Sequence, residues 1–155
     1  MIAHTRYVHT NLVAQDWRGL ASFYERVFGC VPVPPERDFR GPDLEEGTGL
    51  SGAHLVGAHL RLPGWGENGP TLEIFQYEPA APPARTAVNR PGYGHIAFKV
   101  DDVAAARAAV LSEGGRPVGE VVTLQLATGA RVMWCYVTDP EGNIVELQSL
   151  AAPAA

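Results

Sequence analysis

The two halves of this sequence repeat one another, and this duplication is the strongest constraint on the fold. A histidine opens each copy, and each histidine is followed by an acid seven residues later and a glycine twenty residues later. A glutamate lies near the end of each copy. The paired residues are His9 and His95, Asp16 and Asp102, Gly29 and Gly115, and Glu73 and Glu146. Such self-similarity indicates one supersecondary unit used twice.

Composition restricts the class of protein. The 155 residues are 46% hydrophobic and 19% charged, which is typical of a globular domain with a core of ordinary size. A net charge of −5 argues against nucleic acid or an anionic membrane as the main partner. No apolar run approaches the roughly 20 residues of a membrane span, and the N-terminus lacks the apolar core of a signal peptide. Cys30 and Cys135 belong to no CxxC pair, so we expect reduced thiols and a cytoplasmic protein.

Hydrophobic periodicity predicts a βαβββ order in the first half. Residues 6–13 alternate in polarity like a strand, and an apolar stripe at spacings of three and four predicts a helix over 17–28. Asp16 precedes this helix as an N-cap, and Gly29 ends it. The segment 40–51 is expected to be an irregular loop or a short helical turn. The remaining strands are expected near 31–38, 52–62 and 70–77.

The second half predicts the same order after a linker. Residues 79–91 are rich in proline and alanine and suit neither a helix nor a strand. Asp101 or Asp102 is expected to cap the second helix. We expect a strand over 93–100, a helix over 103–112, and strands near 117–126, 131–138 and 143–149. The chain is thus interpreted as one domain, 5–149, made of a first module (5–78), the linker and a second module (92–149).

The strand phase separates a polar face from an apolar one. His9 shares a face with Tyr7, and His95 shares a face with Tyr93, whereas the opposite faces carry aliphatic residues suited to packing under the helices. Glu73 lies within an apolar strand, as does Glu146 in its own copy. An unpaired carboxylate buried there would be costly, which favours a metal or a cationic partner. The alternative is a glutamate that faces solvent on an edge strand.

Several motifs extend this duplication over nearly the whole chain. They are HTNLV at 9–13, FYERVFG at 23–29, LEIF at 72–75, GHIAF at 94–98, DDV at 101–103 and DPEGNIVEL at 139–147. This pattern resembles the vicinal oxygen chelate superfamily, which includes glyoxalase I, methylmalonyl-CoA epimerase, extradiol dioxygenases and bleomycin-resistance proteins. The resemblance implies an α+β fold in which two βαβββ modules form a glyoxalase-like cupped mixed sheet.

The resemblance also implies a metal site. Its ligands fall on His9, Glu73, His95 and Glu146, which suit a divalent ion such as Ni, Co, Zn, Fe or Mn. Two remaining coordination positions would accept vicinal oxygens of a small-molecule substrate. The metal would then polarise the carbonyl and stabilise an enediolate, while a carboxylate moves the proton. Glu146 is the first choice for this catalytic base and Glu73 the second.

Three functions are compatible with this ligand set. The first is a metal-dependent lyase or isomerase of the glyoxalase I or epimerase type, although no arginine cluster is evident in the sequence for the carboxylates of glutathione. The second is an extradiol-type Fe(II) dioxygenase, which a fourth ligand at Glu73 would crowd. The third is a non-catalytic binding protein for an antibiotic or another small molecule. A homodimer is expected, and the ligand pairs could meet within one chain or across two.

Other polar and aromatic residues are expected to have simpler roles. A single histidine on a strand is more often structural than a ligand, which applies to His4, His54 and His59. Lys99, the only lysine, is expected to be an exposed residue at the end of a strand. Trp65 lies in a Gly/Pro-rich turn and could mark a lid or a dimer contact. Four further aromatic residues could line the pocket or pack in the core: Tyr7, Tyr93, Phe75 and Trp134.

Overall fold

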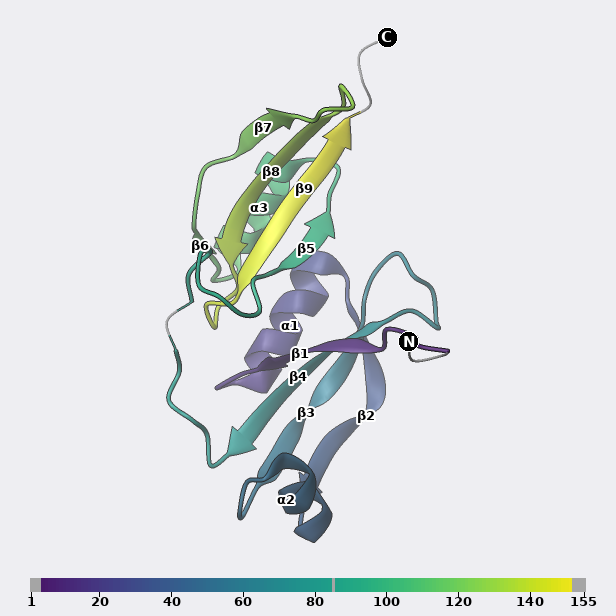
Figure 1. Cartoon of the computed structure of the whole chain (residues 1–155), viewed down its shortest axis with the longest axis vertical. Coiled ribbons are helices and arrows are strands. Elements are labelled where there is room, and N and C mark those ends of the chain that lie inside the picture. The colour runs from purple at the N-terminus through teal and green to yellow at the C-terminus, as the bar shows by residue number, and fades with distance from the viewer. Residues whose placement is uncertain (1–3, 85, 152–155) are drawn as a thin grey trace. The chain divides into compact units, whose positions relative to one another are not determined.

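Each half of the chain forms its own sheet with a helix on one face (Figure 1). The computed structural model describes residues 4–84 and 86–151. Contacts divide the chain into a first unit, Met1–Pro82, and a second unit, Pro83–Ala155. The elements of the first unit are β1 (His9–Val13), α1 (Trp17–Phe28), β2 (Val31–Arg40), α2 (Pro42–Thr48), β3 (His54–Arg61) and β4 (Thr71–Glu78). Those of the second are β5 (Ile96–Lys99), α3 (Val103–Ser112), β6 (Arg116–Pro117), β7 (Val122–Gln125), β8 (Arg131–Thr138) and β9 (Ile144–Ala151).

Both sheets are mixed, with one parallel pairing each. The first has the strand order β1-β4-β3-β2, and β1 runs parallel to β4. The second has the order β5-β9-β8-β6, with β7 also paired to β8, and β5 runs parallel to β9. In both units the last strand therefore lies between the first strand and the hairpin partner. The predicted α+β class of two repeated modules is confirmed.

The two long helices begin and end where the sequence predicts. The Asp16 side chain accepts a hydrogen bond from the Gly19 N–H at 3.1 Å, and Gly29 ends α1 at a φ of 67°. This left-handed conformation favours glycine because a Cβ would be strained there. In the second unit the cap is Asp102 and not Asp101, and it accepts from the Ala105 N–H at 2.9 Å. A short polar side chain at this position satisfies one of the free N–H groups of the first turn.

Some predicted strands were too long. The strand expected over 117–126 is two short pieces, β6 and β7, because Pro117 has no N–H to donate and the chain bends at its next residues. There the Val118 and Gly119 N–H groups both donate to the Tyr136 carbonyl. The strand expected over 6–13 begins only at His9, and the strand expected over 93–100 begins only at Ile96. The segment 40–51 contains the helical turn, α2, which starts at Pro42.

The cores lie between each sheet and its helix. In the first unit α1 packs on β3 and β4, where Leu60, Leu72 and Ile74 are fully buried. In the second unit α3 packs on β8 and β9. Cys30 and Cys135 are buried free thiols, and burial raises the pKa of Cys30 to about 12. None of the described helices has the length and hydropathy needed to cross a membrane.

The Asp102→Ala substitution is expected to destabilise the second unit by about 1 kcal/mol, because the N–H that it caps loses its acceptor. Chemical denaturation of both proteins measures this difference. Asp101→Ala is the matched control, because Asp101 is an adjacent exposed acid outside the helix. Equal losses in the two variants would contradict the assignment of Asp102 as the cap.

Candidate functional site

The first predicted ligand pair meets on the face of the sheet opposite α1. His9 opens β1, and Glu73 lies on β4 opposite Asn11. His9 Nε2 lies 3.1 Å from Glu73 Oε2, and the Asn11 amide lies 3.4 Å from the same oxygen. The Glu73 side chain is only 12% exposed. A largely buried carboxylate is thus satisfied by polar groups of the neighbouring strand.

His59 is a site residue that the sequence alone did not reveal. It lies on β3 directly opposite Glu73, and its Nε2 is 2.9 Å from Glu73 Oε1. Its other nitrogen, Nδ1, lies 3.2 Å from the Thr71 hydroxyl. Burial lowers the pKa of His59, and the charges of Arg37 and His9 lower it further, whereas Glu73 acts in the opposite direction. No repeat signal could identify His59, because the second copy has Tyr136 at this register position.

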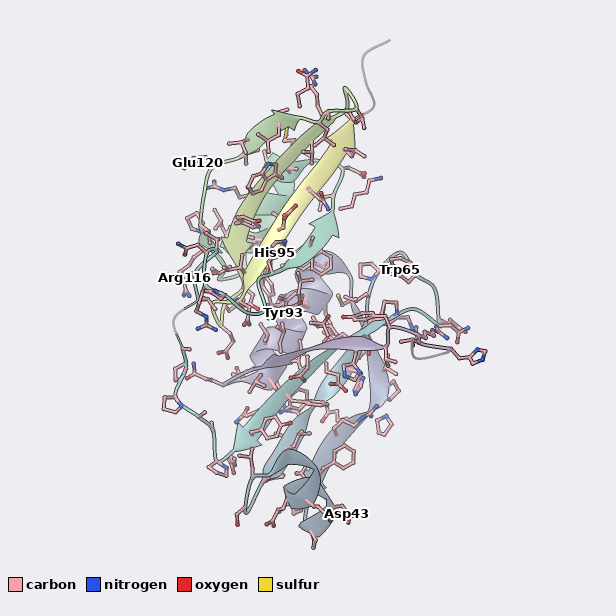
Figure 2. All side chains as sticks on the ribbon, in the orientation of Figure 1. Asp43, Trp65, Tyr93, His95, Arg116 and Glu120 are labelled. Atoms are coloured by element: carbon pink, nitrogen blue, oxygen red, sulfur yellow. The ribbon has the colours of Figure 1, made fainter. Side chains whose placement is uncertain are left out.

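The second predicted pair repeats this arrangement. His95 immediately precedes β5 (Figure 2), and its Nε2 lies 3.0 Å from Glu146 Oε2 on β9. The Glu146 side chain is 17% exposed. Tyr136, opposite Glu146 on β8, donates a hydrogen bond to this carboxylate. Burial, the charge of Glu146 and this hydrogen bond raise the pKa of Tyr136.

Topology explains why both glutamates are shielded. β4 and β9 are interior strands of their sheets, so neither carboxylate lies on an edge strand. Each glutamate has a histidine at one side and a second polar side chain at the other. His9 is the first residue of β1, and His95 immediately precedes β5. The structure therefore brings together the residues of each predicted pair within its own unit.

Aromatic side chains adjoin both pairs. In the second unit His95 and Tyr136 have ring centroids 5.0 Å apart, and Trp134 follows at 4.9 Å from Tyr136. In the first unit the ring of Phe75 lies 5.7 Å from that of His59. Tyr7 and Tyr93, the two other aromatic residues expected to line the pocket or pack in the core, are exposed, at 62% and 65%. Trp65 lies on the β3–β4 loop, is 69% exposed and is labelled in Figure 2.

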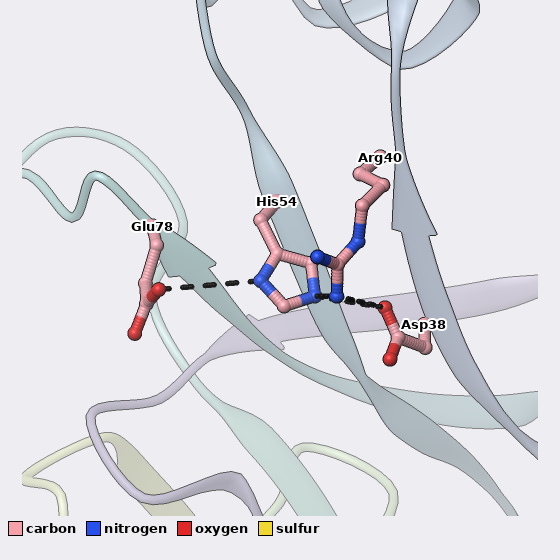
Figure 3. Close-up of polar contacts among 4 residues, drawn as sticks. All are labelled: Asp38, Arg40, His54 and Glu78. Carbon is pink, nitrogen blue, oxygen red and sulfur yellow. Dashed lines mark hydrogen bonds and ion pairs between the residues drawn. The ribbon is translucent and has the colours of Figure 1, made fainter.

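The opposite face of the first sheet carries other polar contacts. His54 lies five residues before His59 on β3, and this odd separation places it on the other face. Its Nε2 is 2.8 Å from Asp38 Oδ1, and its Nδ1 is 4.0 Å from Glu78 Oε2 (Figure 3). Arg40 completes this network at 3.2 Å from Asp38. A separate cavity of about 290 Å³ lies between α1 and β2, also away from the histidine–glutamate pairs.

The donor chemistry of the two pairs fits a divalent metal. Two imidazoles and two carboxylates are ligands that Mn, Fe, Co, Ni and Zn all accept. Within the part of the chain that the structure describes, no group of three or more His, Cys, Asp or Glu side chains is placed to hold a metal ion. Each pair therefore represents half of the four-ligand set expected from the sequence.

Comparisons with known proteins agree with the fold. A glyoxalase family protein from Bacillus cereus is 24% identical, with a TM-score of 0.80 over 98% of this chain and 100% of that one. A glyoxylase/bleomycin resistance protein/dioxygenase domain from Frankia sp. EAN1pec is 16% identical, with a TM-score of 0.57 over 95% and 98%. The fosfomycin resistance protein FosX from Listeria monocytogenes, solved with Mn(II) and sulfate, is 14% identical, with a TM-score of 0.50 over 96% and 93%.

A search of curated proteins gives no match. The family model of the Glyoxalase/Bleomycin resistance protein/Dioxygenase superfamily, in contrast, matches residues 6–147, which is nearly the whole chain. Together with the repeated mixed-sheet units and their histidine–glutamate pairs, this match shows that the chain belongs to the glyoxalase/bleomycin resistance protein/dioxygenase superfamily.

Proposed function

We propose that this chain is a metal-dependent lyase or isomerase that shifts a proton next to a carbonyl of a small substrate bound through vicinal oxygens. The observation that carries the proposal is the recurrence of the same pair, His9 with Glu73 and His95 with Glu146, at 3.1 and 3.0 Å. Both glutamates are largely shielded from solvent, as ligands of a buried metal would be. We further propose that the protein acts in the cytoplasm as a homodimer.

The four residues would hold one divalent ion, and FosX, which carries Mn(II), is a precedent within the fold. The metal, when bound, supplies Lewis-acid polarisation of the carbonyl. His9 and His95 would contribute neutral imidazole nitrogens. The pairs could come from one chain or from two.

The surroundings of the two carboxylates support different roles for them. Glu73 contacts two imidazoles and the Asn11 amide, so both of its oxygens are held. Glu146 contacts one imidazole and the neutral phenol of Tyr136. A carboxylate with fewer hydrogen-bonding partners loses fewer favourable contacts when it takes up a proton. This difference favours Glu146 as the base and Glu73 as the fixed ligand.

Elemental analysis of the purified protein tests the metal site. We expect near-stoichiometric divalent metal in the wild type and at least about 100-fold weaker binding in His9→Ala and Glu146→Ala, because even outer-shell changes cost 10–100-fold. His54→Ala is the control, since His54 lies on the opposite face. Ni, Co or Zn would favour proton transfer, whereas Fe with oxygen uptake would favour a dioxygenase. A wild type that takes up no added Ni²⁺, Zn²⁺, Mn²⁺ or Fe²⁺ would contradict the proposal and favour a binding protein.

A further inference from the structure

Arg61 shares a face of the first sheet with the pair of His9 and Glu73. It lies opposite Thr71 on β4, and Thr71 in turn lies opposite His9 on β1. Residues directly opposite one another on neighbouring strands point to the same face. Arg61 is also two residues beyond His59 on β3, which gives the same face independently. The Arg61 side chain therefore starts from the face of the sheet on which the substrate would bind.

Arg37 reaches the same face from the other side of His59. It lies on β2 opposite Gly57, which is two residues before His59 on β3. Gly57 and His59 lie on the same face of β3, so the Arg37 side chain starts from the face that carries His59. One of its nitrogens donates to the Pro35 carbonyl, a contact that fixes the side chain and leaves the charge uncompensated.

The charge on this face is unbalanced. Among the described residues neither Arg37 nor Arg61 makes an ion pair with a carboxylate, whereas Arg18 and Arg40 on the opposite side have carboxylate partners. Glu73 is the acid that the strand register places on this face of the described sheet, and two imidazoles already contact it. Two half-buried arginine residues without a carboxylate partner are a favourable environment for an anion.

The second unit serves as an internal control. Tyr136 occupies the register position of His59, so Thr138 occupies that of Arg61 and Trp134 that of Gly57, the partner of Arg37. The fold therefore does not require a cation at these positions, since the second copy has Thr138 at one and Val122, the residue opposite Trp134, at the other. The second copy has one arginine on this face, Arg116, which lies on β6 opposite Thr138, so the pair at these two register positions is particular to the first copy.

We propose that Arg37 and Arg61 bind an oxyanion group of the substrate, a carboxylate or a phosphonate, beside the vicinal oxygens that the metal chelates. This inference rests on the proposed function and narrows its substrate class to organic acids. Two residues along a strand span about 7 Å, so the anionic group would be separated from the chelating oxygens by a short carbon chain. The sequence showed no arginine cluster because these residues are 24 positions apart and meet only through the pairing of β2 with β3.

Matched probes test the inference by calorimetry. The three probes are 2-oxoglutarate, its analogue 2-oxo-4-phosphonobutanoate, and 2-oxopentanoate, which keeps the chelating end but lacks the distal anion. All three share the carboxylate of the chelating end, so we expect the metal-loaded wild type to bind at least one of the two probes with a distal oxyanion at least about tenfold more tightly than 2-oxopentanoate. Whichever of these two binds more tightly identifies the oxyanion. Arg37→Gln and Arg61→Gln should each reduce this preference severalfold, and Arg→Lys variants should restore part of it because they keep the charge.

Arg40→Gln is the control, because Arg40 lies on β2 but on the opposite face, in the network of Figure 3. Equal binding of all three probes by the wild type, or an unchanged preference in folded Arg37→Gln and Arg61→Gln, would overturn the inference. Titrations of metal-free protein separate it from the proposed function. If the protein takes up no metal, an arginine-dependent preference for the two probes with a distal oxyanion still supports the oxyanion site. If metal binds and no probe is preferred, the oxyanion site is contradicted and the proposed metal-dependent function is not.

Discussion

Glu146→Gln is expected to lower the rate of carbon-bound proton exchange by about 10²–10⁴-fold, the usual contribution of a general base. Glutamine keeps the shape of the side chain and can still contact His95 and Tyr136, but it takes up no proton at neutral pH. The measurement is deuterium incorporation into hydroxyacetone, a small probe with vicinal oxygens, by NMR in D₂O with metal-loaded protein. Metal content is determined on the same samples, so that loss of the ion and loss of the base are separated.

The control for this prediction is Glu120→Gln. Glu120 is a loop residue whose side chain is 88% exposed and lies away from His95 (Figure 2). Its substitution should leave exchange unchanged. Glu73→Gln should instead act mainly through weaker metal binding. A Glu146→Gln protein with full metal content and the wild-type exchange rate would show that Glu146 is not the base.

Phe23→Ala is expected to destabilise the first unit by about 3–5 kcal/mol, the typical cost of truncating a buried aromatic side chain. Phe23 is completely buried in α1, and its ring packs edge-on against Tyr24 at 5.2 Å and Phe28 at 6.0 Å. The substitution removes both ring contacts and leaves a cavity above the sheet. Urea titration combined with peptide-resolved hydrogen exchange reports on each unit separately.

Val31→Ala is the control for Phe23→Ala. Val31 is an apolar residue of the same unit but is 50% exposed, so its truncation should change stability by no more than about 0.5 kcal/mol. Loss of protection in peptides of β3 and β4 is expected only for Phe23→Ala. Similar protection in both variants would show that α1 contributes little to the core.

Local signals in the sequence were sufficient for most of the elements. The caps Asp16 and Gly29 define α1, and α1 and α3 both start and end at the predicted residues. Strand ends were less accurate, because pairing and not propensity decides where a strand stops. The region after α3 is the clearest example, since Pro117 and the bend after it divide one apolar stretch into β6 and β7.

The candidate site was only partly accessible to the same reasoning. The duplication identifies His9, Glu73, His95 and Glu146, and the two residues of each pair do meet. The sequence predicts a structural role for His59, because a single unrepeated histidine carries no pattern. Its contact with Glu73 depends on the antiparallel register of β3 with β4, which the sequence does not specify.

The sequence by itself therefore determined the repeated strand–helix–strand order and the residue types of the two pairs. Hydrophobic periodicity and helix caps are read from neighbouring residues, and the duplication is read by comparing the two halves of the chain. Only the tertiary structure decided what surrounds each carboxylate. Strand pairing places an imidazole beside Glu73 and a phenol beside Glu146, and it brings Arg37 and Arg61 to one face. The physical reason is that register fixes which side chains from distant segments share a face, and a shift of one residue would reverse every one of them.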